Sequence, residues 1–356
     1  MTSPTATTNA QYEAIPSITD LNNADLSAQL RWALDHKTKP LGALGRLESI
    51  AHQIGAILGT MQPELEQPHA LVFAADHGLA RQGVSAYPSD VTWQMVANML
   101  TGGAAISVLT RQHGLALKLI DCGVAKALPA HPDLIDAKVA AGSADASQQA
   151  AMTPAQMWQA IGTGRQLVSQ LPGNAILLGE MGIGNTSAAA LILARLSGRT
   201  IEECAGAGTG MAAQALAHKR QVLQQVLDLH AQATEPLDIL ACMGGLEIAT
   251  MVGAVLQAAL ERRVIVVDGF VTSAAVLVAA RLQPFVLQRC IFSHQSHEQA
   301  HGLMLDAMRA KALLQMDMRL GEGSGAALAW PLLESACRIL REMASFESAQ
   351  VSGRSD

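Results

Sequence analysis

The amino-acid sequence predicts an α/β protein with a parallel, doubly wound sheet, and three observations support this fold class. Half of the 356 residues are hydrophobic, 15% are charged and 3% are aromatic, which is typical of small-residue helices packed against a buried sheet. After residue 68, short β-branched or Leu-rich runs alternate with longer stretches of helical periodicity. Each short run ends in a polar or glycine-containing turn, as expected where a strand leads into a helix.

The predicted strands follow one another along the chain with helices between them, at residues 70–76, 115–123, 174–180, 237–245, 263–269 and 285–294. This alternation favours a Rossmann-like sheet whose parallel strands are covered on both faces. The carboxyl ends of parallel strands share one edge of the sheet, and ligands bind in the crevice there. The turns that follow the runs are therefore expected to meet in space; they read DHG, DCG, GEMGIGNTS, MGGLE, DGFVTS and SHQS.

Helices are predicted before this region at residues 24–35 and 43–59, and after it at residues 324–343. We expect them to form a small helical satellite domain built from both chain ends. The predicted division is a flexible tail (1–20), the helical part of the small domain (21–65), a large α/β substrate-binding domain (66–315), a catalytic loop with the C-terminal helix of the small domain (316–345) and a second flexible tail (346–356).

Charge and cysteine content restrict the class of protein further. The formal net charge is −6, and there is no basic run or stripe with interleaved aromatics, which argues against a nucleic-acid partner. The five cysteines are far apart and form no C-x-x-C pair, as expected in a reducing cytoplasm.

The N-terminal stretch MTSPTATTNA lacks the features of a secretory signal. Glu180 and Glu247 interrupt the most apolar stretches, so no membrane span is predicted.

The turn GEMGIGNTS predicts an anion site between a strand and a helix. Backbone N–H groups and the helix dipole at such a turn favour a phosphate, here at Gly182, Gly184, Asn185, Thr186 and Ser187. A GTG run that begins at Gly208 and the later Lys219 offer close backbone approach and a cation for the same anion. The turn is neither a G-x-G-x-x-G fingerprint nor a Walker A loop, and the alternative is a tight turn with ordinary helix capping.

Two further turns carry carboxylates. In RLGEGSGAALA, Glu322 stands between two glycines ahead of a helix, where a flat ligand can come close, which makes it a candidate general base. The alternative is a surface glutamate favoured by the helix dipole. The stretch VIVVDGFVTS is similar to the loop of phosphoribosyltransferases that use the ribose diphosphate donor, but Asp268 stands alone where those loops carry two adjacent acids. The chain therefore does not offer the paired acids that would hold magnesium on a diphosphate.

The segment SHQSHEQAH contains HEQAH, which matches the zinc-peptidase pattern H-E-x-x-H. A zinc site would need His297 and His301 on one helical face, Glu298 as the base and a third ligand, for which Glu322 is the candidate. However, this Glu is embedded in a Gly-x-Gly turn rather than in a second helix, and we expect no metal here. A zinc metallopeptidase and a non-catalytic nucleotide-binding protein are the alternatives to the interpretation that follows.

Seven motifs in order from about residue 38 to residue 340 together resemble one enzyme family. They are TKPLGALGRLE, FAADHGLARQGVSAYP, GEMGIGNTS, the Gly-rich stretch that leads to Lys219, DGFVTSAA, SHQS and RLGEGSGAALA. The combination closely resembles the nicotinate-nucleotide:dimethylbenzimidazole phosphoribosyltransferases, which build the lower nucleotide of cobalamin. The resemblance implies transfer of phosphoribosyl from nicotinate mononucleotide to a nitrogen of 5,6-dimethylbenzimidazole, giving α-ribazole 5′-phosphate and nicotinate. It also implies a homodimer without a metal or other cofactor.

The resemblance assigns roles to particular residues. The catalytic glutamate of the family carries over to Glu322. The 5′-phosphate is expected at the turn 182–187 with Lys219 and Ser296, and the base at Tyr87 and Met95. Glu180 and Asp268 are expected to bind ribose hydroxyls or to assist the general base, and further substrate contacts are expected at Gly208, Ser293 and Gly321. A histidine at position 297 is not part of the family signature, so the HEQAH match is interpreted as accidental.

Overall fold

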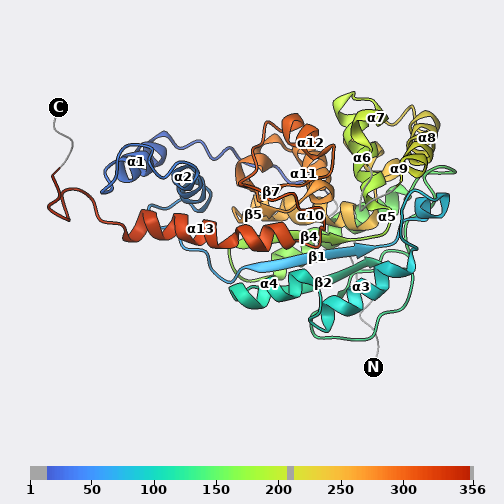
Figure 1. The fold of residues 1–356 in the computed structure, drawn as a ribbon, viewed down its shortest axis with the longest axis horizontal. Coiled ribbons are helices and arrows are strands. Elements are labelled where there is room, and N and C mark those ends of the chain that lie inside the picture. Colours follow the sequence, from blue (N-terminus) through green and yellow to red (C-terminus); the bar gives the residue numbers. More distant parts are fainter. Residues whose placement is uncertain (1–13, 207–211, 353–356) are drawn as a thin grey trace.

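The central element of the fold is a six-stranded sheet in which neighbouring strands run parallel. The computed structural model describes residues 14–206 and 212–352. The strands are β1 (His69–Ala75), β2 (Ala116–Gly123), β3 (Leu134–Asp136), β4 (Ala175–Met181), β5 (Val264–Val267) and β6 (Cys290–Phe292). Their order is β3-β2-β1-β4-β5-β6, which is typical of dinucleotide-binding Rossmann folds (Figure 1). The predicted Rossmann-like sheet is confirmed, and its strand order reverses between β1 and β4.

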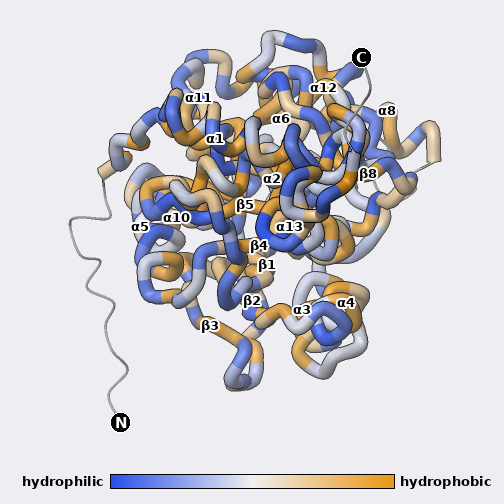
Figure 2. The backbone as a smooth tube through the Cα atoms, turned by 90° about the vertical axis from the view of Figure 1, so that its left-hand side faces the viewer, coloured by the Kyte–Doolittle hydropathy of each residue, from blue (hydrophilic) through white to orange (hydrophobic). Residues whose placement is uncertain are grey.

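Helices connect and cover these strands. The α-helices are α1 (Ala24–Asp35), α2 (Arg46–Leu58), α3 (Asp90–Leu100), α4 (Ala105–His113), α5 (Pro154–Gln170), α6 (Asn185–Ser197), α7 (Ile201–Cys204), α8 (Ala213–Leu229), α9 (Pro236–Met243), α10 (Leu246–Leu260), α11 (Phe270–Leu282), α12 (His301–Ala307) and α13 (Ser324–Glu342). Two short 3₁₀ helices, η2 (Gly78–Gln82) and η3 (Pro284–Arg289), and a two-stranded pair, β7 (His294–Gln295) with β8 (Leu314–Gln315), complete the described elements. Figure 2 shows hydrophilic and hydrophobic residues alternating along outer helices such as α4 and α13.

The sheet is buried on both faces because successive side chains of its strands enter two different hydrophobic cores. On β1, Leu71 and Phe73 belong to one core, while Ala70 and Val72 belong to the other. The first core also contains residues of α5, α6, α10 and α11, and the second contains residues of α2, α4 and α13. The doubly wound arrangement predicted from the apolar runs is therefore confirmed.

The helices α5 and α10 pack against each other unusually closely, and two glycines make this possible. A Cβ atom added at Gly164 would overlap the carbonyl oxygen of Thr250, and one added at Gly253 would overlap that of Ile161. In α10, every residue from Leu246 to Ala259 is buried. Within the described ranges, no helix is both long enough and apolar enough to cross a bilayer.

Both chain ends contribute to a helical arm. Figure 1 shows α1 and α2 beside the C-terminal half of α13, at one end of the molecule. Lys37 joins the two ends: its ammonium group donates to the carbonyl oxygen of Met343 at 2.6 Å, and its backbone forms an isolated bridge with Ser345. Leu30 and Leu34 of α1 belong to the same hydrophobic core as Val72 of β1. The arm thus shares its core with one face of the sheet.

Two of the predicted strands are wrong in whole or in part. Residues 237–245 form helix α9 and the glycine turn after it, because Pro236 starts a helix well and a short buried helix has the same apolar pattern as a strand. Residues 285–289 form the 3₁₀ helix η3 after Pro284, so only Cys290–Phe292 joins the sheet. The sixth strand is instead β3, whose three residues are too few to give a periodic signal.

Candidate active site

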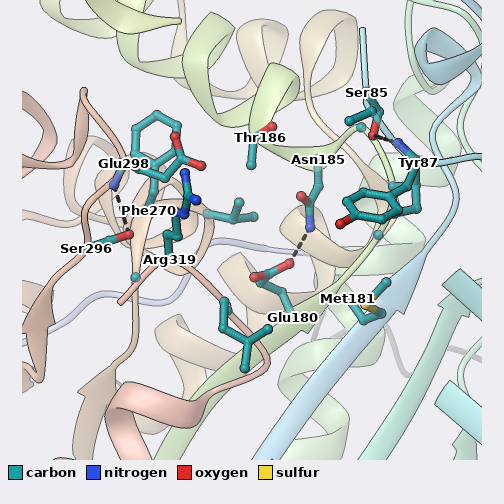
Figure 3. A pocket seen from close by; sticks show the side chains of 18 of the residues that line it. Ser85, Tyr87, Glu180, Met181, Asn185, Thr186, Phe270, Ser296, Glu298 and Arg319 are labelled. Atoms are coloured by element: carbon teal, nitrogen blue, oxygen red, sulfur yellow. Dashed lines mark hydrogen bonds between the residues drawn. The ribbon is translucent and has the colours of Figure 1, made fainter. Parts of the chain in front are cut away.

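A cavity opens at the carboxyl edge of the sheet, where the strand order reverses. Its volume is about 870 Å³ including the open mouth. The lining comes from the loops after β1, β4 and β5, from the segment around β7 and from the loop before α13 (Figure 3). This is the place where open α/β sheets bind ligands, and the strand-end turns 180–186, 269–271 and 294–298 do meet there.

The cavity brings together most of the site residues predicted from the sequence. Those that line it are Tyr87, Glu180, Gly182, Gly184, Asn185, Thr186, Lys219, Ser296 and Gly321. The remaining described candidates, which do not line it, are Met95, Ser187, Asp268, Ser293 and Glu322. Gly208 lies outside the described residues. The structure therefore separates the predicted residues into those that line the cavity and those that do not.

One corner of the cavity has the geometry of an anion site. Gly184 is the N-cap of α6 with φ 98°, a left-handed conformation that glycine adopts readily, and no described side chain caps this helix. Gly182 lies so close to β1 that an added Cβ would overlap the carbonyl oxygen of Ala75. Lys219 of α8 is 2% exposed and donates to the Thr186 hydroxyl at 3.3 Å. Burial lowers the pKa of Lys219, which the carboxylate of Glu298 partly offsets. An anion bound beside Lys219 would stabilise the charged ammonium group and so offset this lowering of its pKa.

Glu180 stands at the foot of the cavity, at the end of β4. The side-chain amide of Asn185 donates a hydrogen bond to its carboxylate, and Figure 3 shows the two side chains facing each other. Burial raises the pKa of Glu180 to about 8, with a contribution from the charges of Asp268, Glu247 and Glu322. An acid with so high a pKa carries its proton over much of the neutral range, so it is suited to donate a hydrogen bond to a ligand oxygen.

Glu322 occupies a strained loop just before α13. Its φ is 66°, and the glycines on either side, Gly321 and Gly323, have φ values of 83° and 88°. The residue is 3% exposed, and burial raises the pKa of its carboxyl, although the backbone N–H of Ile106 at the start of α4 has the opposite effect. Its Oε2 has no hydrogen-bond partner among the described residues. The carboxyl therefore lies against the N-terminus of α4, next to the cavity wall formed by Gly321.

The expectation that flanking glycines leave Glu322 bare needs correction. The glycines instead allow the left-handed backbone and a close approach to β4. A Cβ at Gly179 would overlap the carbonyl oxygen of Glu322, and a Cβ at Gly321 would overlap Oε1 of Glu180. The loop thus rests directly on the end of β4, and the acid is buried rather than exposed.

Asp268 and Ser293 support this loop from behind. Oδ2 of Asp268 accepts from the backbone N–H of Gly323 at 3.1 Å, and Oδ1 accepts from that of Ala326 at 3.0 Å. Burial raises the pKa of Asp268 to about 7 despite these hydrogen bonds. The Ser293 hydroxyl, which is fully buried, donates to the carbonyl oxygen of Asp268 at 3.2 Å. Neither side chain lines the cavity, so each affects it only through the backbone that it holds in place.

The HEQAH segment does not form the zinc-peptidase arrangement. Helix α12 begins only at His301, so the two histidines do not lie one turn apart on a helix, and the His297 side chain is 64% exposed. No group of three or more His, Cys, Asp or Glu residues in 14–206 and 212–352 is placed to hold a metal ion. The buried His301 accepts from the backbone N–H of Ser296 through Nδ1 at 2.8 Å and faces the Ser273 hydroxyl with Nε2 at 3.1 Å. It therefore fixes the backbone of a cavity-lining serine.

Several lining residues were not predicted from the sequence. They are Ser85, Ala86, Met181, Phe270, His294, Glu298, Arg319 and Leu320, among others. Met181, His294 and Arg319 lie inside motifs quoted under Sequence analysis. Their position in these motifs could have indicated that they line the site. Ser85 and Ala86 also lie inside a quoted motif, FAADHGLARQGVSAYP, but in its irregular loop between η2 and α3, where no periodicity indicates which side chain faces a ligand.

A cavity at the switch point of a Rossmann-like sheet, with a glycine turn and a buried lysine at one corner, is typical of an α/β enzyme that handles a phosphorylated small molecule. The family model described as "Phosphoribosyltransferase" matches residues 19–351. The chain belongs to the nicotinate-nucleotide–dimethylbenzimidazole phosphoribosyltransferase family and is a pentosyltransferase. The family membership and enzyme class predicted from the motifs are confirmed.

The relatives match over almost the whole chain. The protein of that name from Variovorax paradoxus (strain S110) is 65% identical over 340 residues, covering 96% of this chain and 97% of the relative. The one from Cupriavidus necator is 55% identical, covering 95% and 98%. A crystal structure of CobT from Thermus thermophilus is similar with a TM-score of 0.90 at 40% identity, covering 93% of this chain and 100% of that chain.

Proposed function

We propose that this enzyme transfers the phosphoribosyl group of nicotinate mononucleotide to a ring nitrogen of 5,6-dimethylbenzimidazole, with Glu322 as the general base and inversion at C1′. The observation that supports this most strongly is the position of Glu322, a buried acid behind the cavity wall formed by Gly321, with the start of α4 on its other side. The names of the relatives support the choice of substrates.

The donor fits the charges of the cavity. Its 5′-phosphate would bind at the N-terminus of α6, beside Thr186 and the buried ammonium group of Lys219. Glu180, whose pKa is about 8, would donate to a ribose hydroxyl or assist the base. The leaving group needs little help, because the pyridinium nitrogen keeps the electron pair of the breaking C1′–N bond and nicotinate departs with a neutral ring nitrogen.

The acceptor is proposed to lie against the apolar surface next to Glu322. Met95 and Met181 pack against the hydrophobic core that contains Ile106, and the backbone N–H of Ile106 faces the Glu322 carboxyl. Tyr87, which is half exposed, lines the same side of the cavity (Figure 3). One benzimidazole nitrogen attacks C1′ while the other loses its proton to Glu322 as positive charge develops on the ring.

The stereochemistry follows from a single displacement. The donor has the β configuration and the proposed product the α configuration, so attack occurs on the face opposite the departing pyridine. Chromatography and NMR of a reaction containing nicotinate mononucleotide and 5,6-dimethylbenzimidazole test this. We expect nicotinate and an α-nucleotide in equal amounts, and neither product when one substrate is omitted. Nicotinate release without an acceptor, or binding of the donor without any release, would contradict the proposal.

The buried His301 is predicted to support phosphate binding through Ser296. Burial lowers the pKa of His301 to about 3, so the ring is neutral at working pH and Nδ1 can accept from the Ser296 N–H. Replacing His301 by Phe removes this acceptor and should raise KM for nicotinate mononucleotide roughly tenfold, the cost of one buried hydrogen bond. His301→Asn offers an amide oxygen near the Nδ1 position and should recover most of the affinity.

The matched control is the other histidine of HEQAH. The exposed His297 side chain has only a weak pairing with Asp317 at 3.8 Å, so steady-state kinetics of His297→Phe should match the wild type. Equal losses in both Phe variants, or no difference between His301→Phe and His301→Asn, would show that the ring nitrogen does not position Ser296.

We also propose that the enzyme works as a homodimer in the cytoplasm. The widely spaced free cysteines are consistent with a reducing compartment. Trp32 of α1 and Leu41, which are 61% and 77% exposed, place apolar surface on the helical arm, where a second copy could cover it.

A further inference from the structure

The loop that carries Glu322 has a backbone conformation that needs external support. Residues 321–323 all have positive φ, at 83°, 66° and 88°. Glycine tolerates this region, but a residue with a side chain is disfavoured there and adopts it only where its surroundings enforce it. The structure must therefore contain the contacts that hold Glu322 in place.

Those contacts come largely from one side chain, Asp268, at the end of β5. Its carboxylate accepts from the backbone N–H groups of Gly323 at 3.1 Å and Ala326 at 3.0 Å, and the N–H of Gly325 also interacts with it. These groups belong to the N-cap and first turn of α13, whose own N-cap residue is a glycine without a side chain. Asp268, which follows strand β5, thus caps helix α13 in the way that an N-cap side chain caps its own helix.

The carboxylate of Asp268 is enclosed by protein groups and does not line the cavity. The residue is 1% exposed and does not line the cavity, although its neighbours Gly269 and His294 do. The Ser293 hydroxyl donates to its carbonyl oxygen, and Nδ1 of His294 lies 3.7 Å from Oδ1. Gly325 packs so tightly against both residues that a Cβ there would overlap Nδ1 of His294 and would lie 2.8 Å from Oδ1 of Asp268.

We propose that Asp268 is a positioning residue for Glu322: its carboxylate caps α13 and holds the left-handed loop 321–323 in the conformation that presents the base. The inference rests on the proposed function, since it assumes that Glu322 is the base. It replaces the earlier expectation that Asp268 contacts a ribose hydroxyl with an indirect role through the backbone of Gly323.

The substitution Asp268→Asn tests this positioning role most directly. It keeps the size of the side chain but replaces one acceptor oxygen by an NH₂ group, which then faces a backbone N–H. We expect kcat to fall roughly 10²-fold, as displacement of a catalytic group by about 1 Å can cause. KM and binding affinity for nicotinate mononucleotide should stay within about threefold, because the anion corner is untouched.

A double-mutant cycle separates positioning from substrate binding. We would measure kcat for the wild type, Asp268→Asn, Glu322→Gln and the double variant. If Asp268 acts through Glu322, its replacement should cost little or nothing further in the Glu322→Gln background. The same loss in both backgrounds, or a rise in KM for the donor with kcat unchanged, would overturn the inference. Wild-type turnover in Glu322→Gln alone would instead contradict the proposed function.

The matched control is Asp121, a second buried aspartate at a strand end. It is 4% exposed, accepts from the backbone N–H of Val124 at 2.8 Å and does not line the cavity. Asp121→Asn should keep kcat within about threefold of the wild type; an equal loss there would show that Asp268→Asn acts only by weakening the fold. Should Asp268→Asn fail to fold, Asp268→Ser tests the same contact, because its shorter side chain cannot accept from both backbone N–H groups of α13. The inference predicts the same selective loss of kcat, and wild-type kcat in a folded Asp268→Ser would overturn it.

Discussion

Replacing Glu322 by Gln should lower kcat by about 10³-fold or more while KM for nicotinate mononucleotide changes little. General base catalysis contributes about 10²–10⁴-fold, and an amide cannot take the proton from the benzimidazole ring. The substitution keeps the size of a side chain that is 3% exposed, so the fold should be retained. Steady-state release of nicotinate in the presence of 5,6-dimethylbenzimidazole measures the effect.

The same residue sets the expected pH dependence. Burial raises the pKa of the Glu322 carboxyl above the ordinary value of 4.5. Because the base must be ionised to accept a proton, kcat should fall as the pH drops through that raised pKa and level off above it. The control is Glu334→Gln, an exposed position on α13, which should behave as the wild type. Wild-type turnover in Glu322→Gln would show that another group is the base.

Replacing Lys219 by Met should lower kcat/KM for nicotinate mononucleotide by about 10- to 150-fold. The buried ammonium group is the cation beside the N-terminus of α6, and a charge-assisted contact with phosphate is worth about 1.5–3 kcal/mol. Methionine keeps the length and apolar body of the side chain, so packing should survive. KM for the benzimidazole should not change, because that ring is proposed to bind on the other side of the cavity.

A donor without the 5′-phosphate makes the Lys219 prediction specific. With nicotinic acid riboside, the wild type and Lys219→Met should be almost equally slow, since the anion that Lys219 binds is absent. Lys118→Met removes a lysine whose partner is Asp133, at 2.8 Å on the edge of the sheet, and serves as the control with normal kinetics. An equal loss with both donors would mean that Lys219 stabilises the fold or the ribose rather than the phosphate.

The sequence predicted the parts of the fold that depend on local patterns. Helix α1 was predicted with its observed bounds, because Asn23 caps it and a helical period follows. Strands β1, β4 and β5 were predicted because their apolar runs end in turns. The run 237–245 failed because a buried helix and a buried strand are equally apolar, and only packing decides between them.

The candidate site could be predicted where the residues proposed to bind one group of the ligand lie in a single short segment. The glycines and hydroxyl residues of the turn 182–187 indicated an anion site, and in the structure Lys219 of α8 contacts Thr186 of this turn. The environment of Glu322 was not predictable, because it depends on contacts with Gly179, Ile106 and Asp268, which are distant in sequence. Likewise, no local pattern shows that His301 supports Ser296, since that contact forms only when the loop folds back on α12.

A crystal structure of the enzyme with 5,6-dimethylbenzimidazole and the reaction product nicotinate would show whether Glu322 is the base. We expect the ring beside Met95 and Met181, with a carboxylate oxygen of Glu322 turned from Ile106 to within about 3 Å of a ring nitrogen. A ring bound in the cavity with Glu322 still against Ile106, and with another group at its nitrogen, would contradict it.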